Sequence, residues 1–238
     1  MKKNISFLYR LLVIISLFVG ITLNIFHVSN AMKIMAYYTL QVNVISLATF
    51  VIFEILDFLK KQYKDSYVYY LIKGELIVSV VLMMIVYVVA LTPKHFQMTQ
   101  TKNKIADIFV HVISPIMIII DYALFDEKGN FKYYYPIIWT LFPITYVIFV
   151  YTYSYFGGKF YNIGGSKKYA YPFLDFERYG ITNVFVWTLL IGIVIIIIGM
   201  IIVFFDRKIK LIKFKKKSKQ WKLFRLFYII DIKYLKVL

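Results

Sequence analysis

The chain has 238 residues, of which 61% are hydrophobic and none is cysteine, and its formal net charge is +17. Soluble domains are about 45–50% apolar, so this composition excludes an ordinary soluble protein and predicts one that is embedded in lipid. The lack of cysteine excludes disulfides, thiolate metal sites and a catalytic thiol.

Six apolar stretches are each long enough for a membrane-spanning helix, which needs about 20 residues. In chain order they cover residues 9–28, 35–57, 67–92, 107–125, 134–156 and 182–205. None alternates with the period of two that marks a membrane β-barrel. The first stretch also fits a signal peptide ending near Ala31, but its length favours retention as a span. We therefore expect an all-α fold, with a six-helix transmembrane domain over residues 1–206.

Residues 207–238 form a basic tail. Basic residues near span ends mark the cytoplasmic side. A topology with both termini in the cytoplasm places 20 of them inside and 8 outside, and without the tail the count is 8 to 8. On a helical wheel Lys219, Lys222 and Arg225 lie opposite Phe224, which predicts an amphipathic helix on the inner membrane surface. A disordered tail is the alternative. Its charge suits anionic lipid headgroups rather than nucleic acid.

Tyrosines gather near the ends of the apolar stretches. The chain has 22 of them, and examples are Tyr37, Tyr38, Tyr67, Tyr69, Tyr70 and Tyr133 to Tyr135. Aromatic residues at these positions are typical of the belt at a membrane–water interface. We therefore expect these side chains to lie at the interface.

Two polar residues near the starts of apolar stretches are the best candidates for chemistry. Thr39 lies in YYTLQVNVISLATFVIF and His111 in DIFVHVISPIMIII. Both stretches begin on the same side in the expected topology, and each residue lies about 6 Å below the start of its helix. An imidazole is the usual base for a weak hydroxyl nucleophile. The alternatives are a threonine bonded to its own helix and a histidine that packs against a neighbouring one.

Polar neighbours on the same helical faces extend this candidate site. Asn43 follows Thr39 by four residues and shares its face, and Ser114 shares a face with His111. Asn43 is therefore a candidate donor to an oxyanion, and either side chain is a candidate to orient the imidazole.

Charged residues occur deeper in the spans. Lys73, Glu75 and Asp121 lie within apolar stretches, where an ionised side chain faces the interior of the bundle and pairs with another. We expect Lys73 to pair with Asp121, Asp57 or Glu54. Such a pair is either structural or part of a proton or ion path.

The histidines do not predict a metal centre. The chain has His27, His95 and His111, and their spacing does not match a metal-ligand motif. We expect no metal and no cofactor.

Three short motifs point to a known family. YYTLQVNVI, HVISPIMIIIDYALF and YPFLDFERYG resemble, in this order, the bacterial six-span membrane family related to the androgen-induced proteins. The resemblance covers about residues 7–206 and leaves the tail unexplained. Vertebrate members of the wider superfamily hydrolyse fatty-acid esters of hydroxy fatty acids with a threonine and a histidine inside the membrane. The resemblance assigns these roles to Thr39 and His111, and it implies a multi-pass protein of the bacterial cytoplasmic membrane.

Three functions follow as hypotheses. The first is an integral membrane hydrolase that cleaves a lipid ester with Thr39 as nucleophile and His111 as base. The second is a small ion-coupled transporter whose path uses Lys73, Glu75 and Asp121. The third is a non-enzymatic membrane scaffold whose tail binds anionic lipid or a partner.

Overall fold

The computed structural model describes residues 2–26, 30–91, 104–161 and 167–235, with side chains for 4–26, 30–89, 104–161 and 167–211. His27 and His95 lie outside these ranges. The described residues form helices and no strand. The elements are α1 (Lys2–Phe26), α2 (Ala31–Met35), α3 (Tyr38–Phe58), α4 (Tyr67–Val86), η1 (Tyr87–Leu91), α6 (Lys104–Ile108), η2 (Phe109–Ile113), α7 (Ser114–Phe125), α8 (Tyr135–Ile138), α9 (Leu141–Tyr155), η3 (Pro172–Leu174), α10 (Phe176–Tyr179) and α11 (Ile181–Leu235).

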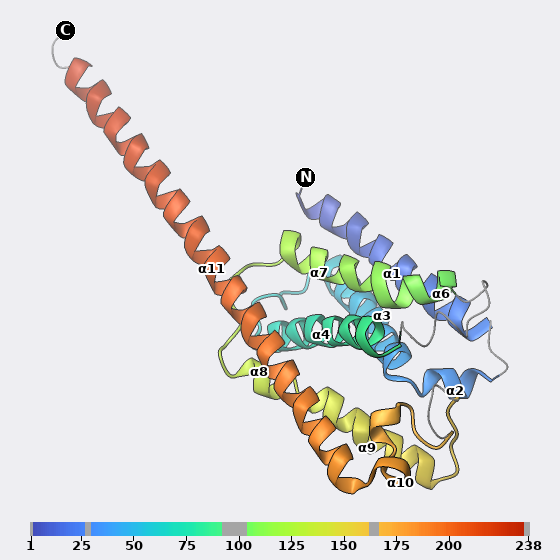
Figure 1. Cartoon of the computed structure of the whole chain (residues 1–238). Helices are drawn as coiled ribbons and strands as arrows, with labels where there is room; N and C mark the ends of the chain where they lie inside the picture. The colour runs from blue at the N-terminus through green and yellow to red at the C-terminus, as the bar shows by residue number, and fades with distance from the viewer. Residues whose placement is uncertain (1, 27–29, 92–103, 162–166, 236–238) are drawn as a thin grey trace.

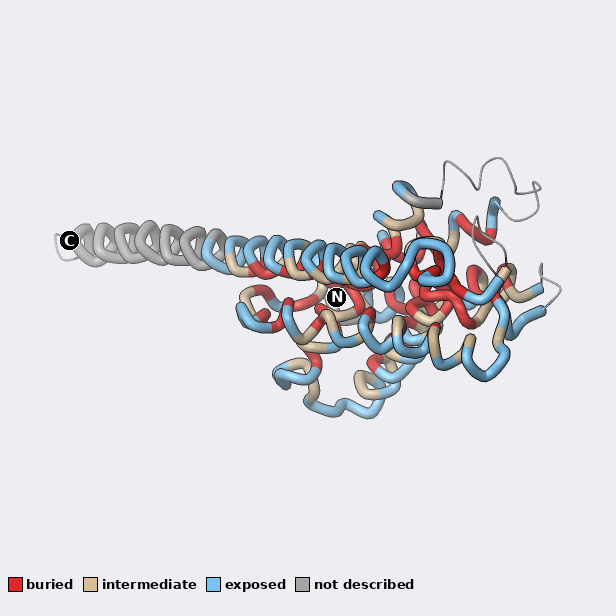
Figure 2. Tube along the Cα trace, turned by 60° about the horizontal axis from the view of Figure 1, so that its bottom comes forward, coloured by how far each residue is buried: buried red, intermediate tan, exposed pale blue. Residues whose placement is uncertain are grey.

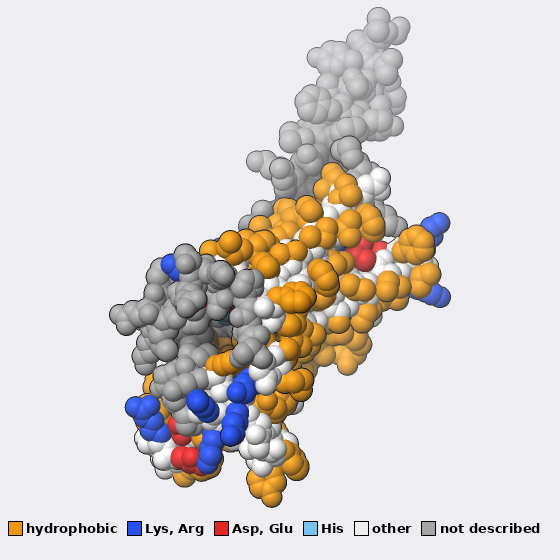
Figure 3. Space-filling model, turned by 90° about the vertical axis from the view of Figure 1, so that its right-hand side faces the viewer, with side chains coloured by type: hydrophobic (Ala, Val, Ile, Leu, Met, Phe, Trp, Pro, Cys, Tyr) orange, Lys and Arg blue, Asp and Glu red, His pale blue; other side chains and the backbone are white. Residues whose placement is uncertain are grey.

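Six helical stretches in the described chain are long and apolar enough to cross a membrane, which confirms the predicted all-α polytopic fold. They run over Asn4–Phe26, Tyr38–Phe58, Tyr67–Val89, Lys104–Phe125, Tyr135–Tyr155 and Ile181–Leu211. These bounds lie within a few residues of those predicted, except that the last span extends further. Figure 3 shows the corresponding surface: a broad hydrophobic band with basic side chains gathered towards its two ends.

The spans divide into two groups on either side of α4. On one side α1 packs against α3 and α7, and α4 closes this four-helix unit by contacts with α3 and α7. On the other side lie α9 and α11, where α11 contacts α4 and α8 (Figure 1). Buried residues concentrate in the interior, whereas most of the described part of α11 is exposed (Figure 2). The apolar side chains exposed there would face lipid.

The short helix α8 lies between α4 and α11 because two glycines leave room for it. The indole of Trp139 occupies the space where a Cβ on Gly74 would project, and its Nε1–H donates to Leu71 O at 2.9 Å. On the other side, the ring of Pro136 packs against Gly199 of α11. Trp139 is fully buried, so this contact fixes α11 against the four-helix unit.

A buried network of charged side chains joins α1, α3, α4 and α7. Lys73 pairs with Asp121, as one of the sequence-based alternatives predicts, and also lies 3.4 Å from Asp126. Arg10 donates to Asp121 at 2.9 Å and also pairs with Asp57 and Asp126 at 3.2 and 3.3 Å. Arg10 is one of the 20 basic residues that the predicted topology counts on the cytoplasmic side. Its side chain is only 1% exposed and belongs to the core. Such buried charges are tolerated because they are paired.

The helix α11 passes residues 206 and 207 without a break and ends at Leu235, so the predicted tail is helical up to that residue. Hydrogen bonds fix α11 where the predicted transmembrane domain ends and the predicted tail begins. Asp206 accepts hydrogen bonds from the Tyr122 hydroxyl and, at 3.2 Å, from the Phe131 N–H, while Arg207 donates to Phe131 O at 3.1 Å. The side chains beyond Leu211 lie outside the described set, and the location of the tail on the membrane surface stays a prediction.

The tyrosines only partly follow the predicted interfacial belt. Tyr67, Tyr133 and Tyr134 are exposed. In contrast, the side chains of Tyr37, Tyr38, Tyr69, Tyr70 and Tyr135 are buried. The buried ones are stabilised by ring contacts and hydrogen bonds, such as that from the Tyr69 hydroxyl to Asp126. Tyrosine in this chain is therefore a packing residue as much as an interfacial one.

Candidate active site

Thr39 lies in the first turn of α3. The N-cap residue of α3, Tyr37, has an extended backbone (φ −80°, ψ 145°) and provides no side-chain cap. The first N–H groups of α3 therefore have no partner within their own helix. Thr39 is 7% exposed, so its hydroxyl is placed in the protein interior beside polar main-chain groups.

His111 lies in the π-helical turn η2, which the sequence does not predict in detail. The N–H of Ser114 bonds to Phe109 O, five residues back. Pro115 explains the position of this turn, because proline has no N–H to bond the carbonyl of His111 and disturbs the α-helical pattern there. Single π turns inside α-helices are frequent at functional sites.

The structure brings Thr39 and His111 together across two spans. Thr39 Oγ1 lies 3.1 Å from His111 Nε2, and His111 Nδ1 lies 3.1 Å from the main-chain oxygen of Asp107. A carbonyl oxygen only accepts, so Nδ1 carries the proton of the neutral ring and Nε2 accepts from the Thr39 hydroxyl. This is the geometry of a nucleophile and its general base, with the base oriented by a third group.

An aromatic ring also fixes the imidazole. Tyr87, in the π-helical segment η1, stacks on His111 with ring centroids 4.0 Å apart and an angle of 15° between the planes. His111 is 8% exposed. The ring is thus held by a hydrogen bond at Nδ1 and a stack on one face, which leaves Nε2 directed at Thr39.

Tyr171 adds a second hydroxyl to the site. It precedes η3 and is buried. Its hydroxyl interacts with the side chains of Thr39 and Tyr146 and with the main chain at Tyr38 and Thr39. Burial raises the pKa of Tyr171 to about 12, although these hydrogen bonds lower it in part. The phenol is therefore protonated at neutral pH and able to donate.

A small cavity adjoins these groups. Its volume is about 60 Å³, and it lies between α3, α4, α9 and α11. Its lining combines Thr39, Tyr38, Tyr146 and Tyr171 with apolar side chains, namely Leu82, Met83, Val86, Pro143, Val147, Phe173, Leu174 and Ile191. A reacting group held there would contact the Thr39 hydroxyl with little water around it.

Asn43 and Ser114 have other contacts than those expected. The Asn43 amide donates to Thr39 O at 2.8 Å and to Val110 O at 3.2 Å. These two bonds use both of its hydrogens and tie α3 to η2, so this geometry offers no support for Asn43 as an oxyanion donor. Ser114 shares a hydrogen bond with Ser16 of α1 at 2.8 Å. The group that orients His111 is instead the main-chain oxygen of Asp107.

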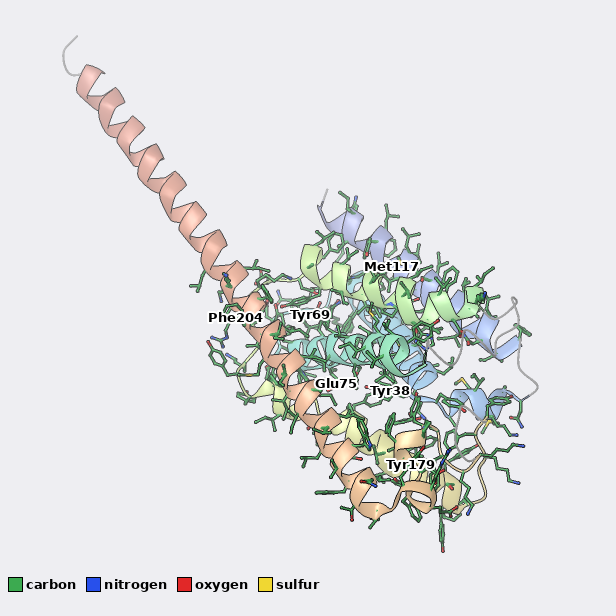
Figure 4. All side chains as sticks on the ribbon, in the orientation of Figure 1. Tyr38, Tyr69, Glu75, Met117, Tyr179 and Phe204 are labelled. Carbon is green, nitrogen blue, oxygen red and sulfur yellow. The ribbon has the colours of Figure 1, made fainter. Side chains whose placement is uncertain are left out.

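The charged candidates lie apart from this pair in the fold. Lys73 and Asp121 are fully buried in the ion-pair network of the four-helix unit. Glu75 belongs to the other side of α4, near Tyr38 (Figure 4). It accepts from Ser79 at 3.0 Å, and Ser79 accepts from the Tyr38 hydroxyl at 3.1 Å. Glu75 is thus connected to the start of α3 through two hydroxyls.

Sequence reasoning missed Tyr171, Tyr87 and the Asp107 carbonyl. Two of these are tyrosines among 22 in the chain, so residue type alone does not distinguish them. The third is a main-chain atom, which leaves no trace in residue identity. Tyr171 begins the motif YPFLDFERYG, but this motif alone predicts no role for the residue.

Comparison of the chain with protein-family models, with curated proteins and with solved structures finds no match.

Proposed function

We propose that this protein is an integral membrane hydrolase that cleaves a carboxylic ester of a lipid. The observation that carries the proposal is the 3.1 Å contact between Thr39 Oγ1 and His111 Nε2, with Nδ1 directed at Asp107 O. The residues come from spans that are 72 positions apart in sequence. The resemblance to the androgen-induced proteins supports the same two roles.

In the proposed reaction His111 Nε2 takes the proton of the Thr39 hydroxyl as Oγ1 attacks the ester carbonyl. The tetrahedral intermediate collapses as the C–O bond to the alcohol breaks, and His111 returns the proton to the leaving alkoxide. Water, deprotonated by His111, then attacks the acyl–Thr39 ester. As the bond between the acyl carbon and Thr39 Oγ1 breaks, His111 returns this proton to Oγ1 and the carboxylic acid leaves. At the end of the cycle both the Thr39 hydroxyl and the neutral imidazole of His111 are restored.

The negative charge of the tetrahedral intermediate needs a donor close to Thr39. Tyr171 supplies a hydroxyl that interacts with the side chain and the main chain of Thr39, and the N–H groups of Tyr38 and Thr39 at the start of α3 lack helical partners. Donors fixed in advance in a dry site stabilise such an oxyanion strongly. We assign Tyr171 as the principal donor.

The test combines chemical labelling with turnover in detergent-purified protein. A fluorophosphonate probe should label the native protein and fail to label Thr39→Val or His111→Ala, and both variants should lose lipid-ester hydrolysis by about 10²–10⁴-fold. Thr49→Val is the matched control, since Thr49 is a threonine of the same helix whose hydroxyl bonds to Ile45 O at 2.8 Å. Labelling and turnover that persist in Thr39→Val would rule the mechanism out.

A further inference from the structure

The helices α9 and α11 enclose a second, larger hollow outside the candidate active site. It is a groove of about 700 Å³ between α9, α10 and the first turns of α11. Tyr151 and Ser154 of α9 line one wall, and Val184, Phe185 and Thr188 of α11 line the other. These helices approach each other at α8 and diverge towards their other ends, where η3 and α10 lie between them (Figure 1).

This groove lies about one helical turn from the cavity beside Thr39. On α9, Tyr151 lines the groove and Val147 the cavity, four residues away on the same face. On α11, Thr188 lines the groove and Ile191, three residues further along, lines the cavity. One helical turn is about 5.4 Å, so the two spaces are neighbours. Tyr151 donates to Leu174 O at 2.9 Å and marks the boundary between them.

The chemistry of the lining fits an amphipathic molecule. Aromatic and aliphatic side chains cover most of the groove, and its charged residues are Lys168 and Glu177, which pair at 2.7 Å. Both belong to the segment between the last two spans, outside the hydrocarbon region. An apolar groove with a polar rim that opens between two spans is in contact with lipid, which is the solvent of this surface.

We propose that the groove between α9 and α11, together with the neighbouring cavity, forms a crevice that binds a lipid ester. The lipid enters this crevice laterally from the bilayer. Its polar end lies at the rim formed by Lys168 and Glu177, and its ester-bearing part reaches the cavity beside Thr39. Cleavage at Thr39 rests on the proposed function, whereas occupation of the crevice is independent of it.

The test uses a fatty-acid ester of a hydroxy fatty acid that carries a photoreactive diazirine between its free carboxylate, the polar end, and its ester. The full-length protein in lipid nanodiscs is irradiated with the probe, and labelled peptides are identified by mass spectrometry. We expect labels on α9 and α11 at the groove, in the native protein and equally in Thr39→Ala. In Thr188→Trp, which fills the groove, labelling should fall about tenfold, equivalent to about 1.4 kcal/mol of lost binding.

Two controls separate blocking from misfolding. Thr49→Trp places the same side chain at another partly buried threonine that also bonds back to its own helix, and it should leave the labelling unchanged. Because the chain has no cysteine, Ser154→Cys can be alkylated with a bulky maleimide after folding. This modification should reduce the labelling as Thr188→Trp does. If Thr188→Trp does not fold, the alkylated Ser154→Cys protein alone tests the crevice.

The outcomes distinguish the two proposals. Labels on other helices, or labelling that neither Thr188→Trp nor alkylated Ser154→Cys reduces, would overturn the crevice as the lipid site. If the probe labels the crevice of the native protein but this protein hydrolyses no lipid ester, the result would support the crevice as a lipid site and refute the proposed function.

Discussion

Removal of the Lys73 ammonium should destabilise the protein far more than removal of a similar ammonium near the surface. In Lys73→Met the carboxylates of Asp121 and Asp126 stay buried and keep Arg10 as their common cation. Breaking a buried ion pair by removing one partner costs about 3–5 kcal/mol. The cation–π contact of Lys73 Nζ with the Phe50 ring, at 4.5 Å, is lost as well.

Lys64→Met is the matched control, because Lys64 also pairs with an aspartate, Asp57, at 2.6 Å. Its side chain is 40% exposed, against 0% for Lys73. A pair near the surface contributes at most about 1 kcal/mol. The free energy of unfolding can be measured by titrating SDS into mixed micelles and following the fluorescence of the three tryptophans, of which Trp139 is fully buried.

A third variant tests the assignment to an ion pair. In Lys73→Met/Asp121→Asn the carboxylate left by the first substitution is neutralised, so the loss should be smaller than the sum of the two single losses by about 0.5–3 kcal/mol. The reasoning would be refuted if Lys73→Met and Lys64→Met cost the same. Strict additivity in the double variant would equally contradict a direct pair.

Two further predictions concern the site and the packing. Tyr171→Phe removes one hydroxyl from the candidate oxyanion site and should lower kcat for lipid-ester hydrolysis by about 10²–10³-fold, with fluorophosphonate labelling slowed but not abolished; unchanged kcat would exclude Tyr171 as the donor. Gly74→Ala forces a Cβ into the Trp139 ring and should destabilise the protein by about 1–3 kcal/mol. The control is Gly192→Ala, because no atom lies within 4 Å of a Cβ at this position. This variant should be neutral or stabilised by up to about 1 kcal/mol. Equal SDS midpoints for the two alanine variants would contradict the packing argument.

The parts of the fold that follow from hydropathy could be predicted, and those that follow from pairing across spans could not. A run of about 20 apolar residues has few alternatives to a membrane helix, so the six spans were predictable. The polar residues Thr39 and His111 stood out because hydrocarbon makes each polar group costly, and they lie in contact. The burial of Arg10 in the ion-pair network was not predictable, because near the start of a span a flanking charge and a buried charge look alike in sequence.

The fold separates the groups that hold the spans together from the proposed catalytic pair. Lys73 of α4 faces the ion pairs with α1 and α7, whereas Leu82 and Val86 of the same helix face the cavity beside Thr39. The helix α3 and the turn η2, which carry Thr39 and His111, belong to the unit that these ion pairs join. The groove, by contrast, lies between α9 and α11, and α11 contacts the short elements α8, α10 and η3. The proposed catalytic pair and the proposed lipid groove therefore belong to different halves of the bundle. We expect substitutions in the groove to alter binding of the lipid without moving Thr39 away from His111.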